Sequence, residues 1–189
     1  MHTSTLGNVI GLVNKIMDYF WLSIHKGANL RDTIIISGSP RTGTTWIMEI
    51  LETLPSYRSI FEPFHKEWFP EVKRLNLSSL HRPYVYYKDN NPVLKEYLRK
   101  VFQGHVTTRV LHYIPTPRNI YKRLKVSKII VKFIRANRLL PWIANNFELR
   151  GIYFIIRHPC GTIASQLRTN IAEYYKLPIP TLKNHIKRN

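Results

Sequence analysis

A loop flanked by glycines, between a predicted strand and a predicted helix, constrains the fold of this chain most. Residues 33–37 (TIIIS) form a β-branched, apolar run of the kind that is buried on both faces of a sheet. Gly38 ends this run, and from Thr44 apolar residues recur at helical spacing as far as Pro55. The segment 38–45 therefore predicts a turn from a strand into a helix, in which backbone N–H groups and the helix N-terminus face an anion.

Two further apolar runs predict more strands. Residues 128–133 (KIIVKF) precede a helical pattern that reaches Phe147, and residues 152–156 (IYFII) precede another that reaches Leu167. Three buried strands separated by helical stretches are typical of an α/β fold, in which helices cover both faces of a parallel sheet in three layers. We expect this α/β domain to span residues 31–170.

The chain between the first two of these strands is too long for a single crossover. It measures about 70 residues and predicts an insertion over the carboxyl edge of the sheet, where ligands of α/β proteins bind. We expect a helix at 92–101 within it. Tyr84, Tyr86 and Tyr87 stand beside Lys88 in the same insertion, and we interpret them either as the lining of a substrate pocket or as simple loop packing.

The charge of the chain is strongly positive. It has 29 Lys and Arg against 11 Asp and Glu, a formal net charge of +18, which favours polyanions, anionic membrane surfaces or phosphate-bearing small molecules as partners. Basic residues accumulate between 99 and 138, where no Asp or Glu occurs. The single cysteine, Cys160, excludes an intramolecular disulfide framework and a multi-cysteine metal site, and it favours a reducing, cytoplasmic compartment.

The two ends of the chain are predicted to differ from the central domain. Residues 9–24 are apolar but are interrupted by Lys15 and Asp18, and they are shorter than the roughly 20 apolar residues that span a bilayer. We therefore expect no transmembrane segment, and we interpret residues 1–30 as an amphipathic helical segment, with membrane-surface association as the alternative. Residues 171–189 are expected to be a basic tail or the start of a further C-terminal part.

The loop itself is similar in spacing to the phosphate-binding motif G-x-x-x-x-G-K-[ST]. Thr44 stands at the lysine position, and the cation lies earlier, at Arg41. An enzyme that transfers phosphate from a nucleoside triphosphate also needs an acidic residue near the end of a neighbouring strand to hold Mg²⁺, and the residues 133–135 and 157–159 contain none. We therefore predict a metal-free anion site; the alternative is an ordinary glycine turn capped by Thr44.

Two segments resemble motifs of the sulfotransferase family, whose sulfuryl donor is 3′-phosphoadenosine-5′-phosphosulfate (PAPS). Residues 40–46 (PRTGTTW) resemble that family's 5′-phosphosulfate loop. Residues 157–167 (RHPCGTIASQL) resemble its 3′-phosphate motif, in which a strand-end arginine and a serine eight residues later hold the phosphate. The resemblance covers about residues 31–170 and implies the topology of the P-loop-containing nucleoside triphosphate hydrolases. The PAPS-binding residues that it implies are Ser39, Arg41, Thr42, Gly43, Thr44, Thr45, Trp46, Arg157 and Ser165.

The resemblance also implies a reaction: transfer of a sulfuryl group, without a metal, to a hydroxyl or amine of a carbohydrate, a lipid or another acceptor. Arg41 would stabilise charge at the transferred group. Residues 59–65 (SIFEPFH) resemble the segment that carries a Glu-Pro or a catalytic glutamate, so Glu62 is the first candidate for the base. The alternative for Glu62 is a helix cap or a salt bridge to Arg41 or Arg58, and His65 is the second candidate base.

Three further residues have two interpretations each. Trp46 either packs on the adenine or fills the core beneath the loop. Lys132 and Arg135 either steer the nucleotide or are solvated charges at a strand edge. Two other functions stay open beside the sulfotransferase: a P-loop phosphotransferase, and a basic nucleic-acid-binding module that uses residues 99–138, although we expect no nucleic-acid partner.

Overall fold

The structure is a computed structural model that describes residues 9, 12, 13, 16, 19, 20, 27–66, 68–75, 77, 82–106 and 125–169. Most of the predicted N-terminal segment (1–30) and all of the predicted tail (171–189) lie outside these residues. Within the part that is described, no helix is long and apolar enough to cross a membrane.

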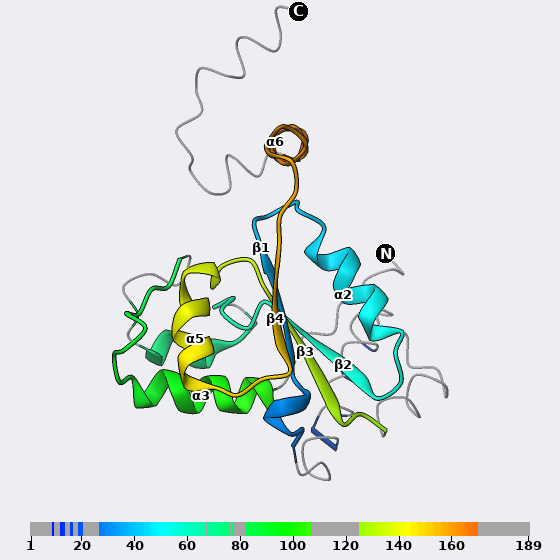
Figure 1. The fold of residues 1–189 in the computed structure, drawn as a ribbon. Helices are drawn as coiled ribbons and strands as arrows, with labels where there is room; N and C mark the ends of the chain where they lie inside the picture. The colour runs from blue at the N-terminus through cyan, green and yellow to red at the C-terminus, as the bar shows by residue number, and fades with distance from the viewer. Residues whose placement is uncertain are drawn as a thin grey trace, which may run out of the picture.

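A parallel sheet forms the centre of the protein, so the predicted α/β class is confirmed (Figure 1). The described residues contribute four strands, in the order β2-β3-β1-β4, and every neighbouring pair is parallel. Their bounds are Ile34–Gly38 for β1, Tyr57–Phe61 for β2, Lys128–Phe133 for β3 and Gly151–Ile155 for β4. Because β1 lies between β3 and β4, the loop that follows β1 leaves the sheet at an interior strand.

Helices connect these strands. The α-helices are α2 (Thr44–Glu52), α3 (Pro92–Phe102), α5 (Leu140–Asn146) and α6 (Pro159–Arg168). In Figure 1, α2 lies on one side of the sheet while α3 and α5 lie on the other. Short 3-10 helices are η1 (Leu30–Asp32), η2 (Pro70–Leu75) and η3 (Asn137–Leu139). Asn91 caps α3 through a bond from the Leu94 N–H, and Pro92 occupies its first turn, where a missing N–H costs nothing.

Two apolar clusters pack on the two faces of the sheet. Alternate residues of a strand point to opposite faces, and the alternation is clear in β1: Ile35 joins the cluster with the α3 and α5 residues Leu98 and Trp142, whereas Ile34 and Ile36 join the cluster with Met48 of α2. Full burial of each such aliphatic side chain contributes about 1.5–3 kcal/mol. The helices on both faces thus fix the sheet, and its carboxyl edge is where the loop after β1 emerges.

The sequence analysis missed one strand. Tyr57–Phe61 forms β2, which pairs with β3 at the edge of the sheet. Only Arg58 and Ile60 of this strand are buried, so its residues alternate between burial and partial exposure. Continuous apolar runs do not reveal such a strand. The three predicted strands are all present, and β2 is the one that the sequence pattern left out.

The prediction that residues 152–156 form a buried strand was also wrong in part. The strand β4 exists, shifted by one residue, but among the described residues it is the other edge of the sheet. Tyr153 is 53% exposed and Phe154 is 48% exposed. These apolar side chains belong to opposite faces of an edge strand that pairs on one side with β1.

Candidate anion-binding site

The loop between β1 and α2 is sharply curved by two residues with left-handed backbone conformations. Arg41 has a φ of 71° and Gly43, which precedes the first residue of α2, has a φ of 98°. A left-handed residue next to right-handed ones turns successive N–H groups toward one concave side. Gly43 provides no side-chain cap, so the first N–H groups of α2, which a helix cannot satisfy internally, are directed to the mouth of this loop.

Glycine is required at the start of the loop for a different reason. A Cβ atom on Gly38 would lie 2.7 Å from the carbonyl oxygen of Ile155 and 2.8 Å from the Thr42 hydroxyl. The loop therefore begins in direct contact with the end of β4. At Gly43, by contrast, a Cβ atom would meet nothing within 4 Å, which means that the loop is open on that side.

The second motif lies against this loop. Arg157 follows β4, and its guanidinium donates to the carbonyl oxygen of Arg41 at 3.4 Å. Arg41 Nε donates to the hydroxyl of Ser165, in α6, at 3.2 Å across 124 residues of sequence. The structure thus brings together three of the residues predicted to bind an anion: Arg41, Arg157 and Ser165. In Figure 1, α6 lies beyond the carboxyl edge of the sheet, next to the loop after β1.

Two side-chain amides that the sequence analysis did not single out also contact the loop. Asn137 Nδ2 donates to the carbonyl oxygen of Gly38 at 3.1 Å, and Gln166 Nε2 donates to that of Pro40 at 2.9 Å. A single sequence carries no signal for such contacts, because an amide after a strand or within a helix has no distinctive spacing.

The other predicted loop residues differ in exposure. Thr44 is buried, whereas Ser39 and Thr45 are exposed and Thr42 is half-buried. The Thr42 hydroxyl donates within the loop to the carbonyl oxygen of Ser39 at 2.8 Å. Trp46 is 67% exposed, so the interpretation that it fills the core was wrong.

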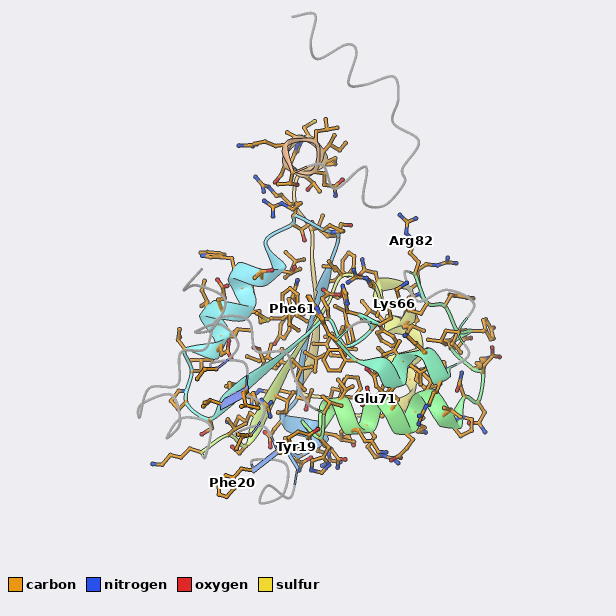
Figure 2. All side chains as sticks on the ribbon, turned by 180° about the vertical axis from the view of Figure 1, so that it is seen from behind. Tyr19, Phe20, Phe61, Lys66, Glu71 and Arg82 are labelled. Atoms are coloured by element: carbon orange, nitrogen blue, oxygen red, sulfur yellow. The ribbon has the colours of Figure 1, made fainter. Side chains whose placement is uncertain are left out.

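Glu62 lies at the same edge of the sheet but in a separate cluster. It follows β2 with a φ of 50° and is 1% exposed. Its carboxylate lies 3.3 Å from Lys132 Nζ and 3.3 Å from an Arg135 guanidinium nitrogen. Lys132 Nζ also lies 3.8 Å from the centroid of the Phe61 ring, and Figure 2 shows Phe61 near the centre of the molecule. We refer to Glu62, Lys132 and Arg135 as the buried ion cluster.

Burial controls the protonation of this cluster. It raises the pKa of the Glu62 carboxyl above its ordinary value, although the charges of Lys132 and Arg135 oppose that rise. Burial likewise lowers the pKa of Lys132, against the attraction of Glu62. Both shifts follow from the cost of holding a charge away from water.

Two sequence interpretations are corrected by the buried ion cluster. Lys132 and Arg135 are not solvated, since they are 2% and 8% exposed. Glu62 does form salt bridges, as one interpretation held, but with these two residues rather than with Arg41 or Arg58. For Arg41 the strand order explains the difference, because β2 pairs with β3 and β3 therefore lies between Glu62 and the loop that carries Arg41.

His65 lies close to Glu62 along the chain and is held in place. Its ring stacks on Trp68 with centroids 4.0 Å apart, and its backbone N–H donates to the carbonyl oxygen of Glu62 at 2.8 Å. Tyr84, Tyr86 and Tyr87 lie on the surface, 40–48% exposed, and Arg138 lies 4.8 Å from the centroid of the Tyr84 ring.

The chemistry available at this edge is the binding and stabilisation of negative charge. Arg41 and Arg157 provide two cations, the loop and α2 provide N–H groups, and Ser165 provides a hydroxyl. In the portion of the chain that the structure covers, no three His, Cys, Asp or Glu side chains are grouped so that they could hold a metal ion. Comparison with protein-family models, with curated proteins and with solved structures finds no match to this chain.

Proposed function

We propose that this protein is a sulfotransferase that transfers a sulfuryl group from PAPS to a hydroxyl or amine, on a fold with P-loop nucleoside triphosphate hydrolase topology. The observation that carries the proposal is the contact between the two motifs. Arg41 of the first motif bonds Ser165 of the second, and Arg157 bonds the Arg41 backbone. Two segments that resemble the two halves of a nucleotide site are therefore adjacent in space as well as present in the sequence.

The residues at this edge fit a ligand with two separate phosphate groups. The loop N–H groups, Arg41, Thr44 and Thr45 would hold the 5′-phosphosulfate, and Arg157 and Ser165 would hold the 3′-phosphate. The open space at Gly43 supports this assignment, because an atom there would not collide with the protein. The exposure of Trp46 leaves its ring accessible for stacking on an adenine.

The proposed chemistry asks the protein for charge stabilisation and for a base. PAPS supplies the sulfuryl group: the acceptor oxygen or nitrogen forms a bond to sulfur while the bond from sulfur to the phosphate oxygen breaks. Arg41 stabilises the negative charge that develops on the departing phosphate. A guanidinium does not readily release a proton, so Arg41 acts through its charge alone.

Glu62 is the proposed acceptor of the proton that leaves the nucleophile. Burial raises the pKa of its carboxyl, and a desolvated carboxylate is a stronger base than a solvated one. Lys132 and Arg135 hold both carboxylate oxygens and orient the group. His65 is the second candidate.

Calorimetric titration distinguishes the proposal from the two other functions. We expect binding of adenosine 3′,5′-bisphosphate, no dependence on Mg²⁺, and weaker binding of ATP with Mg²⁺ and of a random oligonucleotide. Binding of ATP with Mg²⁺ but not of the bisphosphate would favour the P-loop phosphotransferase. Binding of the oligonucleotide alone, with a steep dependence on salt, would favour the nucleic-acid-binding module.

A further inference from the structure

In the loop between β1 and α2, the carbonyl oxygens of Gly38, Ser39, Pro40, Arg41 and Gly43 accept hydrogen bonds from donors of the protein. A loop that directs N–H groups at an anion must direct its carbonyl groups elsewhere, and a polar backbone group needs a partner there. The Ser39 carbonyl accepts from the Thr42 hydroxyl and also from the Thr42 N–H, which is thereby used within the loop. The Gly43 carbonyl accepts from the Ile47 N–H of α2. The carbonyls of Gly38, Pro40 and Arg41 depend on side chains from elsewhere.

Those side chains approach from both flanking strands. Asn137 belongs to η3, which follows β3, and donates to Gly38 O at 3.1 Å. Gln166 belongs to α6, which follows β4, and donates to Pro40 O at 2.9 Å. Since β1 pairs with β3 on one side and β4 on the other, the loop is held from two directions by elements that do not belong to it.

The orientation of Asn137 is itself fixed. The Ser37 hydroxyl lies 2.5 Å from Asn137 Oδ1 and 3.2 Å from the carbonyl oxygen of Phe133, so Oδ1 is the nearer of its two acceptors. Ser37 is fully buried. A hydroxyl that donates to Oδ1 leaves Nδ2 as the end of the amide that faces the loop. Ser37 and Gly38 are neighbours in the chain. The Ser37 hydroxyl orients the Asn137 amide, and the Gly38 carbonyl oxygen accepts a hydrogen bond from that amide.

We infer that Asn137 and Gln166 are positioning residues that hold the carbonyl groups of Gly38 and Pro40 outward, so that the loop N–H groups stay directed at the anion. We call this pair the carbonyl clamp. The inference rests on the proposed function, because it takes the bound anion to be the 5′-phosphosulfate of PAPS. The clamp also ties the loop to α6, because Gln166 is adjacent to Ser165, which bonds Arg41.

Substitution of Gln166 tests the clamp. Gln166→Met keeps the length of the side chain and removes the donor, and it is expected to weaken binding of adenosine 3′,5′-bisphosphate by about tenfold. Gln166→His places a ring N–H where the amide N–H lies, and it is expected to restore affinity to within about threefold of the unsubstituted chain. Asn137→Leu is expected to weaken binding in the same way as Gln166→Met.

A matched control is available in α5. Asn145 Nδ2 donates to the carbonyl oxygen of Tyr87 at 3.0 Å, so Asn145→Leu removes the same kind of bond away from the loop. We expect it to leave bisphosphate affinity unchanged. The free energy of unfolding of every variant is measured by urea titration, so that a loss of affinity is compared with any loss of stability.

The titrations are repeated with inorganic pyrophosphate. Two results would overturn the clamp. In the first, the Gln166→Met variant binds the bisphosphate as tightly as the unsubstituted chain does. In the second, Gln166→Met and Gln166→His lose the same amount of bisphosphate affinity. If the unsubstituted chain binds pyrophosphate but not the bisphosphate, the proposed sulfotransferase function is contradicted. The clamp is then tested by the pyrophosphate affinities of the same variants. A chain that binds neither anion contradicts both proposals.

Discussion

Glu62 combines a strained backbone conformation with a buried charge, and both cost free energy. A non-glycine residue with a φ of 50° costs roughly 1–3 kcal/mol in backbone strain, and a carboxylate that is 1% exposed loses its hydration. Lys132 and Arg135 compensate by taking one oxygen each. Backbone strain at a buried charge is characteristic of functional sites, which is consistent with the proposed role of Glu62 as a base.

Removal of the Glu62 charge is expected to destabilise the fold in a manner that depends on pH. Glu62→Gln leaves Lys132 and Arg135 buried without a counter-ion, at a cost of about 3–5 kcal/mol near neutral pH. The pKa of Lys132 is already below its ordinary 10.5 and falls further in the variant. At pH values between the pKa of Lys132 in the folded variant and its pKa in the unfolded chain, Lys132 is protonated only in the unfolded chain. The free energy of unfolding of the variant therefore rises with pH in this range.

Urea unfolding at about pH 7 and about pH 9.5 checks this expectation, because that range lies below the ordinary pKa of lysine. The destabilisation should be smaller at the higher pH. Glu148→Gln is the matched control, since Glu148 pairs with Arg31 at 2.7 Å on the exposed surface, where a salt bridge contributes little. A Glu62→Gln variant that is as stable as this control would show that the buried ion cluster does not stabilise the fold.

At the scale of elements, the contact between β1 and β4 determines the position of α6. Gly38 is the last residue of β1 and pairs with Ile155 of β4, and no side chain fits between it and the Ile155 carbonyl. Because α6 follows β4 directly, the distance between these strands sets where Arg157 and Ser165 lie relative to the loop.

Gly38→Ala is therefore expected to push β4 away from β1. The added methyl group would lie 2.7 Å from a backbone oxygen, and relief of such overlap costs about 1–3 kcal/mol. Amide hydrogen exchange in β4 should accelerate. Gly43→Ala is the control, because its cost comes from the left-handed φ of 98° and not from a collision, so exchange in β4 should be unaffected. Unchanged exchange in the Gly38→Ala variant would refute this account of the strand contact.

The elements that the sequence predicted well are those with a continuous pattern. The strand at 128–133 and the helix that begins at Thr44 were predicted correctly, because apolar β-branched residues dominate the first and apolar residues recur at helical spacing in the second. The strand Tyr57–Phe61 was missed because half of it faces away from the core. Strand order has no local signal, so the partners of Glu62 could not be foreseen.

The part of the candidate site that lies on loops directly after strands could be predicted from the sequence. Loops that follow parallel strands meet at one edge of the sheet, so Arg41 and Arg157 were expected near each other, and the described structure places them in contact. The amides of Asn137 and Gln166 act through single hydrogen bonds to backbone atoms. Such bonds depend on the position of two elements in space, and no residue pattern encodes them.

At the scale of the whole molecule, the net charge of +18 is not concentrated in one described surface. In the basic stretch 99–138, Arg99 and Lys100 pair with Glu96 on the surface, whereas Lys132 and Arg135 are buried around Glu62. Residues 107–124 of this stretch lie outside the described residues. The four described cations named above are thus paired with carboxylates, which reduces the charge that they offer to a polyanion.

The central claim is that the two motifs form one nucleotide site, and Arg157→Ala tests it most directly. We expect the variant to lose about tenfold in affinity for adenosine 3′,5′-bisphosphate, about 1.4 kcal/mol. The loss for 5′-AMP, which has no 3′-phosphate, should be clearly smaller, because only the bond from Arg157 to the Arg41 carbonyl oxygen bears on that ligand. Arg150→Ala removes the same charge at the opposite end of β4, where Arg150 pairs with Asp32, and should change neither affinity. Unchanged bisphosphate affinity in the Arg157→Ala variant would contradict the claim.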